Sequence, residues 1–283
     1  MGLRQMLARL MGERDQTREG SESAVATATA TQAAPDAPEI KPDPSKNIDE
    51  SALAEELFRA DGKPGVMIDV GAHFGSTTKP FLAMGWKVIG FEPDPKKHNA
   101  LKEIAQDPNF TLLTCAVGDK PQEGVPFFTS QESTGIASLV PFRETHTEGP
   151  KVQIRTLRDV LVELGEDHID YLKIDAEGFD LRVLEGFPFE SVKPRAVMCE
   201  FEDGKTNNIG YSTHDLGKYL QDLGYNVYMS EWYPIVRYGI THRWRSIKPY
   251  PCELADPNGW GNFVAVLPGE TDELFQKIMR PWA

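Results

Sequence analysis

Short runs of β-forming residues alternate with amphipathic helical patterns along most of this chain, and this alternation limits the fold more than any other feature. Strands are predicted over residues 66–70, 87–92, 110–117, 170–175, 195–202, 225–230 and 262–267. Helices are predicted over residues 51–60, 77–84, 95–105, 156–164, 177–185 and 212–223. Because parallel strands need crossover connections, this order indicates an α/β fold with a mostly parallel sheet and helices on both faces. The last two strands have no obvious helix between them and are expected to pair antiparallel.

The composition divides the chain into residues 1–47 and residues 48–283. Residues 1–18 place apolar side chains at helical spacing between arginines, which predicts a short amphipathic helix that packs on a partner, frays, or rests weakly on a membrane surface. Residues 20–47 are rich in Ala, Thr, Pro and charge and contain no aromatic residue, so a disordered tether is expected. Residues 48–283 are predicted to form one folded domain.

Charge and cysteine content exclude several classes of protein. The formal net charge of −13 argues against a nucleic-acid partner, because contacts to phosphates need clustered Lys and Arg. The cysteines, Cys115, Cys199 and Cys252, form no CxxC pair, which argues against a disulfide framework or a structural zinc site. The sequence has no apolar stretch near the roughly 18 residues of a membrane span. A cytoplasmic protein with no integral membrane segment is expected.

The first predicted strand leads into a glycine turn, 66-VMIDVGAHFGSTT-78, in which Asp69 precedes Gly71 and Gly75. The next strand ends in Glu92, about 20 residues after the first glycine, where an acidic side chain accepts hydrogen bonds from a ribose. A dinucleotide pyrophosphate needs a second turn glycine, but His73 stands there, and Asp69 adds negative charge. S-adenosylmethionine carries a cationic sulfonium and no phosphate, so it suits this turn better than NAD does.

Four blocks of the sequence resemble the FkbM family of S-adenosylmethionine-dependent methyltransferases. They are 68-IDVGAHFG-75, 91-FEPDP-95, 115-CAVGD-119 and 171-YLKIDAEGFDLRVLEG-186, and they occur in the family's order. The resemblance implies the Rossmann-like class I methyltransferase fold and O-methylation, often of sugars or other natural-product hydroxyls.

Carried over by that resemblance, the cofactor-binding residues are Asp69, Gly71, His73, Gly75, Glu92, Asp94, Ala116 and Val117. The first four would form the cofactor loop, Glu92 would hold the ribose, and the last three would border the adenine. Two alternatives stay open at this level. Asp94 also suits a helix N-terminus before Pro95. For His73, the role of a loop residue oriented by backbone hydrogen bonds is favoured over that of a proton acceptor.

Acidic residues fall at the carboxyl ends of two predicted strands, where ligands bind in open α/β sheets. Asp175 is the first candidate for the catalytic base or substrate orienter, and Glu200 and Glu202 are further catalytic candidates. Glu177 belongs to the same group, although it equally suits a helix cap. Converging carboxylates repel each other unless a proton or a cation lies among them, so a divalent metal is possible, but the sequence assigns no metal ligand.

The segment 230–261 concentrates aromatic and basic residues in an otherwise acidic protein. Trp232, Tyr233, Arg237 and Trp244 are candidate substrate contacts, because aromatic faces stack on sugar rings and arginines bind carboxylates or phosphates. Core or interface packing is the alternative reading. The expected function is O-methylation of a hydroxyl on a saccharide or glycoconjugate acceptor with S-adenosylmethionine. The alternatives are a nucleotide-dependent oxidoreductase and a non-catalytic glycan-binding or scaffolding module with the same fold.

Overall fold

The computed structural model describes residues 48–238 and 240–280. The predicted amphipathic helix over residues 1–18 and the tether over residues 20–47 lie outside the described residues. Within the described ranges, no helix is both long and apolar enough to cross a membrane.

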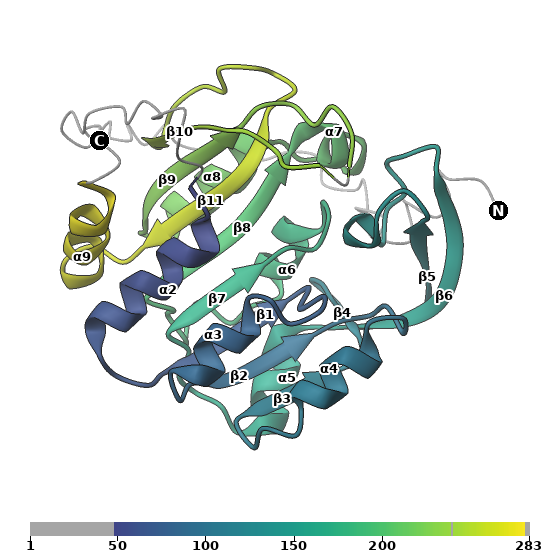
Figure 1. Cartoon of the computed structure of the whole chain (residues 1–283), viewed down its shortest axis with the longest axis horizontal. Coiled ribbons are helices and arrows are strands. Elements are labelled where there is room, and N and C mark those ends of the chain that lie inside the picture. Colours follow the sequence, from purple (N-terminus) through teal and green to yellow (C-terminus); the bar gives the residue numbers. More distant parts are fainter. Residues whose placement is uncertain (1–47, 239, 281–283) are drawn as a thin grey trace, which may run out of the picture. The chain divides into compact units, whose positions relative to one another are not determined.

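The centre of the domain is an eight-stranded sheet (Figure 1). Its strands, in spatial order, are β10 (Trp244–Pro249), β9 (Asn226–Trp232), β11 (Trp260–Val266), β8 (Ala196–Glu202), β7 (Tyr171–Ile174), β1 (Val66–Val70), β2 (Lys87–Phe91) and β3 (Phe110–Leu113). The strands from β8 to β3 pair in parallel, whereas β11 pairs antiparallel with both β8 and β9. The predicted mostly parallel sheet with antiparallel last strands is therefore confirmed.

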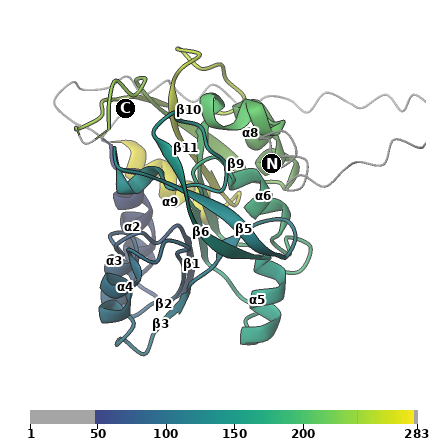
Figure 2. The ribbon, with the colours of Figure 1, turned by 90° about the vertical axis from the view of Figure 1, so that its right-hand side faces the viewer.

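Helices cover both faces of this sheet, as predicted. They are α2 (Glu50–Asp61), α3 (Thr78–Ala83), α4 (His98–Ile104), α5 (Leu157–Leu164), α6 (Asp180–Glu185), α7 (Asp203–Thr206), α8 (Thr213–Asp222) and α9 (Glu270–Met279). In Figure 2, α2, α3 and α4 lie on one side of the strands, and α5, α6 and α8 lie on the other. Layers of this kind, around a sheet whose last strands run antiparallel, form the class I methyltransferase fold that the resemblance implies.

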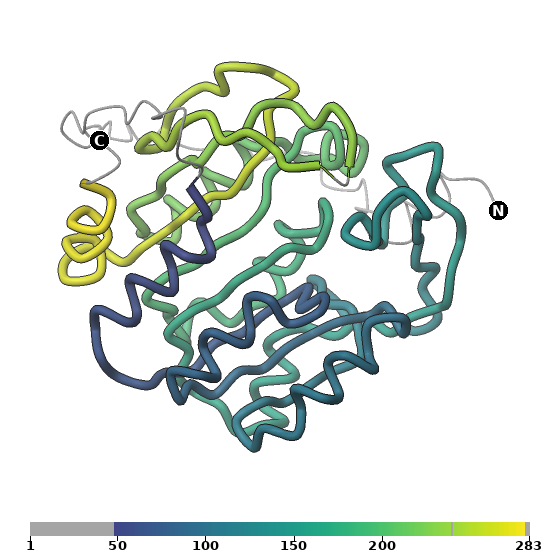
Figure 3. The backbone as a smooth tube through the Cα atoms, viewed as in Figure 1, coloured from purple at the N-terminus to yellow at the C-terminus, as the bar shows by residue number. Residues whose placement is uncertain are grey.

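A second, smaller sheet lies beside the main one and was not predicted. It has the order β4 (Ala116–Val117), β6 (His146–Arg155) and β5 (Gln122–Ser130), and the short 3-10 helix η1 (Thr134–Ile136) follows β5. Sequence periodicity misses β5 and β6 because only two positions of each strand are buried, and each strand contains a glycine and a proline. The tube in Figure 3 shows this unit rising beside the carboxyl ends of the main strands.

Two predicted boundaries differ from the structure near this end of the sheet. The strand expected over residues 110–117 is divided, because β3 belongs to the main sheet and β4 to the small one. The helix expected from residue 177 begins at Asp180. Glu177 and Gly178 have φ values of 51° and 91°, which a right-handed helix cannot contain.

Candidate functional site

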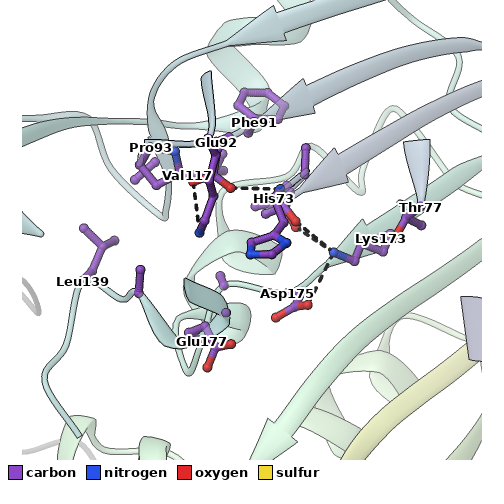
Figure 4. Close-up of a pocket in the computed structure, with 18 of the residues that line it drawn as sticks. His73, Thr77, Phe91, Glu92, Pro93, Val117, Leu139, Lys173, Asp175 and Glu177 are labelled. Carbon is purple, nitrogen blue, oxygen red and sulfur yellow. Dashed lines mark hydrogen bonds and ion pairs between the residues drawn. The ribbon is translucent and has the colours of Figure 1, made fainter. Parts of the chain in front are cut away.

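A cavity of about 360 Å³ lies at the carboxyl ends of β1, β2 and β7 and under the small sheet. Figure 4 shows residues that line it. The loop after β1, the end of β2, the β4 strand and the turn after β7 supply most of the wall. Five of the predicted cofactor-binding residues line this cavity: Gly71, His73, Glu92, Ala116 and Val117. Asp175 and Glu177 line it as well.

The loop after β1 is shaped by residues in the left-handed region. Gly71 has a φ of 79°, and a Cβ atom there would lie 2.1 Å from the carbonyl oxygen of Asp175. This approach explains why glycine is required at the position. His73 has a φ of 52°, and its backbone N–H donates to Glu92 Oε2 at 2.9 Å. Its ring Nε2 lies 3.2 Å from Thr134 Oγ1, so the ring connects this loop to η1.

Glu92 holds the turn after β2 and remains at the cavity wall. Its Oε1 accepts from the backbone N–H of Asp94 at 2.8 Å, while its Oε2 accepts from His73. Burial raises the pKa of Glu92, and Lys97, whose ammonium lies 3.7 Å from Oε1, opposes this rise. Each carboxylate oxygen has a second lone pair, so both can still accept hydrogen bonds from hydroxyl groups.

The structure places Asp94 behind this wall rather than in it. Its side chain is buried, Oδ1 accepts from the backbone N–H of Lys96 at 3.0 Å, and Oδ2 lies 3.8 Å from the Lys97 ammonium. These contacts are those of a turn residue before α4. Apolar side chains that do line the cavity include those of Pro93, Val117, Phe127 and Leu139.

A buried lysine, which sequence reasoning missed, connects the first glycine turn to the end of β7. Lys173 lies 3.4 Å from Asp69 Oδ1 and 3.5 Å from Asp175 Oδ2, and it donates to the carbonyl of Gly71 at 3.2 Å. Asp69, which is fully buried, also accepts from Thr78 Oγ1 at 2.7 Å. Asp69 therefore stabilises the loop through Lys173 and Thr78 and is not in the described cavity wall. The sequence feature that could have revealed Lys173 is its place inside the predicted buried strand 170-DYLKID-175.

A second buried lysine stands among the acids at the ends of β7 and β8. The Lys205 ammonium lies 2.7 Å from Glu177 Oε2, 2.7 Å from Glu200 Oε2 and 3.1 Å from Glu202 Oε2. We call these four residues the Lys205 cluster. Burial raises the pKa of Glu177 to about 7 and raises that of Glu200, against the lowering effect of Lys205.

The Lys205 cluster bears on metal binding. Asp175, Glu177 and Glu200 each offer an oxygen within 4.8 Å of the others. However, the Lys205 ammonium already contacts two of these three carboxylates, so the chain itself supplies positive charge at this point. Glu200 and Glu202 face Lys205 and are not in the described cavity wall, whereas the Asp175 side chain is 44% exposed and lines the cavity.

The four predicted substrate contacts are not in the described cavity wall. Trp232 donates its indole N–H to buried Glu50 Oε1 at 2.7 Å. The guanidinium groups of Arg243 and Arg245 lie over the ring of Tyr233, which is still partly exposed to solvent. Arg237 is exposed on the same loop. Trp244 is 4% exposed and donates to Ser230 Oγ at 3.0 Å, so its ring is part of the core.

Comparison with known proteins gives one family. The family model described as the methyltransferase FkbM domain matches residues 69–227. No curated protein is significantly similar to the chain. Among solved structures, a precorrin-6y C5,15-methyltransferase from Geobacter metallireducens GS-15 has 13% identity and a TM-score of 0.38, over 77% of this chain and 87% of that one. A magnesium protoporphyrin IX methyltransferase from Synechocystis PCC 6803, with bound SAM, has 14% identity and a TM-score of 0.35, over 77% of each chain.

Proposed function

Because this chain belongs to the FkbM methyltransferase family and is therefore a SAM-dependent methyltransferase, we propose that it methylates a hydroxyl group of a saccharide or glycoconjugate. The observation that carries the proposal is that one cavity has carboxylates at the ends of β2 and β7 and apolar side chains beside β4. Mass spectrometry of glycans from cells with and without the protein, seeking the added mass of one methylene group, tests turnover.

The cavity suits S-adenosylmethionine, which supplies an electrophilic methyl group on a cationic sulfonium. Glu92 would accept from the ribose hydroxyls, and Ala116 and Val117 would border the adenine. Asp175, at the other side of the cavity, would face the reacting groups. A pyrophosphate would meet Glu92, Asp175 and Glu177, and like charges this close repel one another, which disfavours a dinucleotide.

Glu92→Ala should weaken binding of S-adenosylmethionine by roughly tenfold or more, because it removes charge-assisted hydrogen bonds of about 1.5–3 kcal/mol. Isothermal titration calorimetry measures the effect, and circular dichroism checks that the variant is folded. Glu103→Ala, on the exposed side of α4, is the matched control and should bind as the wild type does. Unchanged affinity in a folded Glu92→Ala variant would remove Glu92 from the ribose site.

Asp175 is proposed to orient the acceptor hydroxyl or to take its proton, because it lines the cavity and is partly open to solvent. Glu200 and Glu202 would act on this site through Lys205. The end of β9, with Trp232, and the loop after it, with Tyr233 and Arg237, are proposed as the acceptor-facing surface. For Trp244, the buried position favours packing over contact with an acceptor.

Arg237→Ala and Tyr233→Ala should each raise the acceptor KM by an amount equivalent to about 1–3 kcal/mol and leave cofactor affinity unchanged. Both side chains are exposed, so neither substitution should lower the melting temperature much. The control is Arg158→Ala, which removes an exposed arginine of α5 paired with Glu190. If the two loop variants keep the wild-type KM, this loop does not select the acceptor.

A further inference from the structure

Glu177 stands out among the buried acids because the fold holds it in an unfavourable conformation at the cavity wall. A φ of 51° places this non-glycine residue in the left-handed region, which costs energy and persists where the surroundings enforce it. In Figure 4 its carboxylate lies close to that of Asp175, on the same side of the cavity. Its side chain is 13% exposed, so it is mostly buried but still accessible from the cavity.

Three separate elements hold the turn that carries Glu177. Ser138, which follows η1, donates its hydroxyl to the carbonyl of Glu177 at 2.8 Å. Tyr211, before α8, donates to the carbonyl of Gly178 at 2.8 Å. The stem of Lys205 passes so close to Gly178 that an added Cβ would lie 2.9 Å from Lys205 Cβ. The carboxylate of Glu177 is thus positioned by contacts from far along the chain.

The charges around Glu177 favour one retained proton. Lys205 of α7 faces it, together with Glu200 and Glu202 of β8, Asp175 of its own turn and Tyr238 of the loop after β9. One ammonium cannot neutralise three carboxylates, so the Lys205 cluster holds excess negative charge when all of them are ionised. Adjacent carboxylates in this situation share a proton, and their environments separate their pKa values. Asp175, by contrast, is partly exposed and lies beside Lys173.

We propose that Glu177, held by Lys205 at the cavity wall, is the group that accepts the proton of the acceptor hydroxyl, while Asp175 orients that hydroxyl. This assignment rests on the proposed function. The ion pair with Lys205 uses Glu177 Oε2 and leaves Oε1 for the proton. In the transfer, the acceptor oxygen bonds to the methyl carbon and the carbon–sulfur bond breaks, its electron pair staying on sulfur. The hydroxyl proton moves to Glu177 and later returns to solvent.

The proposal can be tested without knowing the acceptor. S-adenosylmethionine carries a positive sulfonium, whereas S-adenosylhomocysteine carries a neutral thioether at the same place. A cation beside Glu177 favours its ionised form, so binding of S-adenosylmethionine near pH 7 should release more protons than binding of S-adenosylhomocysteine. Isothermal titration calorimetry of the full chain in phosphate and in Tris, which differ in ionisation enthalpy, measures the protons released.

Glu177→Gln should abolish this difference while both ligands still bind. Glu202→Gln is the matched control, because Glu202 also contacts Lys205 but is not in the described cavity wall. Glu202 helps to raise the pKa of Glu177, so in this variant the difference should shrink but remain. Equal release for the two ligands in the wild type would overturn the role of Glu177 while leaving the proposed function standing. Loss of the difference in both variants would also overturn it, since the proton would then belong to the whole cluster. Failure of the wild type to bind S-adenosylmethionine would count against the proposed function itself.

Discussion

Asp175→Asn is expected to lower the rate of methyl transfer by roughly a hundredfold or more while leaving affinity for S-adenosylmethionine nearly unchanged. Asp175 lines the cavity, and its carboxylate lies 3.5 Å from the Lys173 ammonium. Asparagine keeps the size of the side chain but has one acceptor oxygen in place of two, so an acceptor hydroxyl would lose its orientation. The rate is measured with the acceptor that the glycan comparison identifies, and calorimetry measures cofactor binding.

A second measurement on the wild type accompanies this prediction. EDTA should leave the transfer rate unchanged, because Lys173 and Lys205 supply the positive charge next to Asp175 and Glu177. A normal rate in the Asp175→Asn variant would remove Asp175 from the mechanism. Inhibition by EDTA with recovery on adding magnesium would instead show that the carboxylates need a cation besides the two lysines.

Lys205→Met is expected to lower the free energy of unfolding by about 3–5 kcal/mol at neutral pH. Methionine fills a similar volume but leaves Glu177, Glu200 and Glu202 facing one another without their shared cation. The exposed pair of Lys218 and Asp222 on α8 offers a matched control, because Lys218→Met removes a lysine of an i,i+4 ion pair on the surface. Such a pair contributes roughly 0.3–0.5 kcal/mol, so the control should unfold almost as the wild type does.

The loss of unfolding free energy in the Lys205→Met variant should depend on pH, and the buried acids determine the direction of this dependence. Burial raises the pKa of Glu177 to about 7, above its ordinary value, so the folded state holds protons that the unfolded state releases. Stability therefore falls as pH rises through 7, and the variant, which lacks the lowering effect of Lys205, should lose more between pH 5 and pH 8 than the wild type. Urea denaturation at several pH values measures this, and a loss independent of pH would contradict the explanation.

The elements that follow from local periodicity were predictable from the sequence. The main strands other than β10, and the crossover helices, match the prediction because each depends on its own pattern of apolar residues. The edge strand β10 (Trp244–Pro249) was not predicted. The antiparallel pairing of β9 with β11 followed from the expected absence of a crossover helix between them. The glycine at position 71 and the acid at the end of β2 were also readable, since a tight turn and a strand end are local features.

Contacts between distant segments were decided by the tertiary structure alone. Lys205 meets Glu177 because the turn after β7 and the helix after β8 lie side by side at the same edge of the sheet, and nothing in the sequence near Lys205 marks this contact. Trp232 is tied to Glu50 across 182 positions, and Trp244 lies in the core although its segment suggests a binding surface. Strand periodicity says which residues share a face but not which charges from different strands and loops meet there. The meeting of these charges depends on how the crossover connections place the ends of the strands. The tertiary structure therefore determined which acids line the cavity and which are paired with a lysine outside its wall.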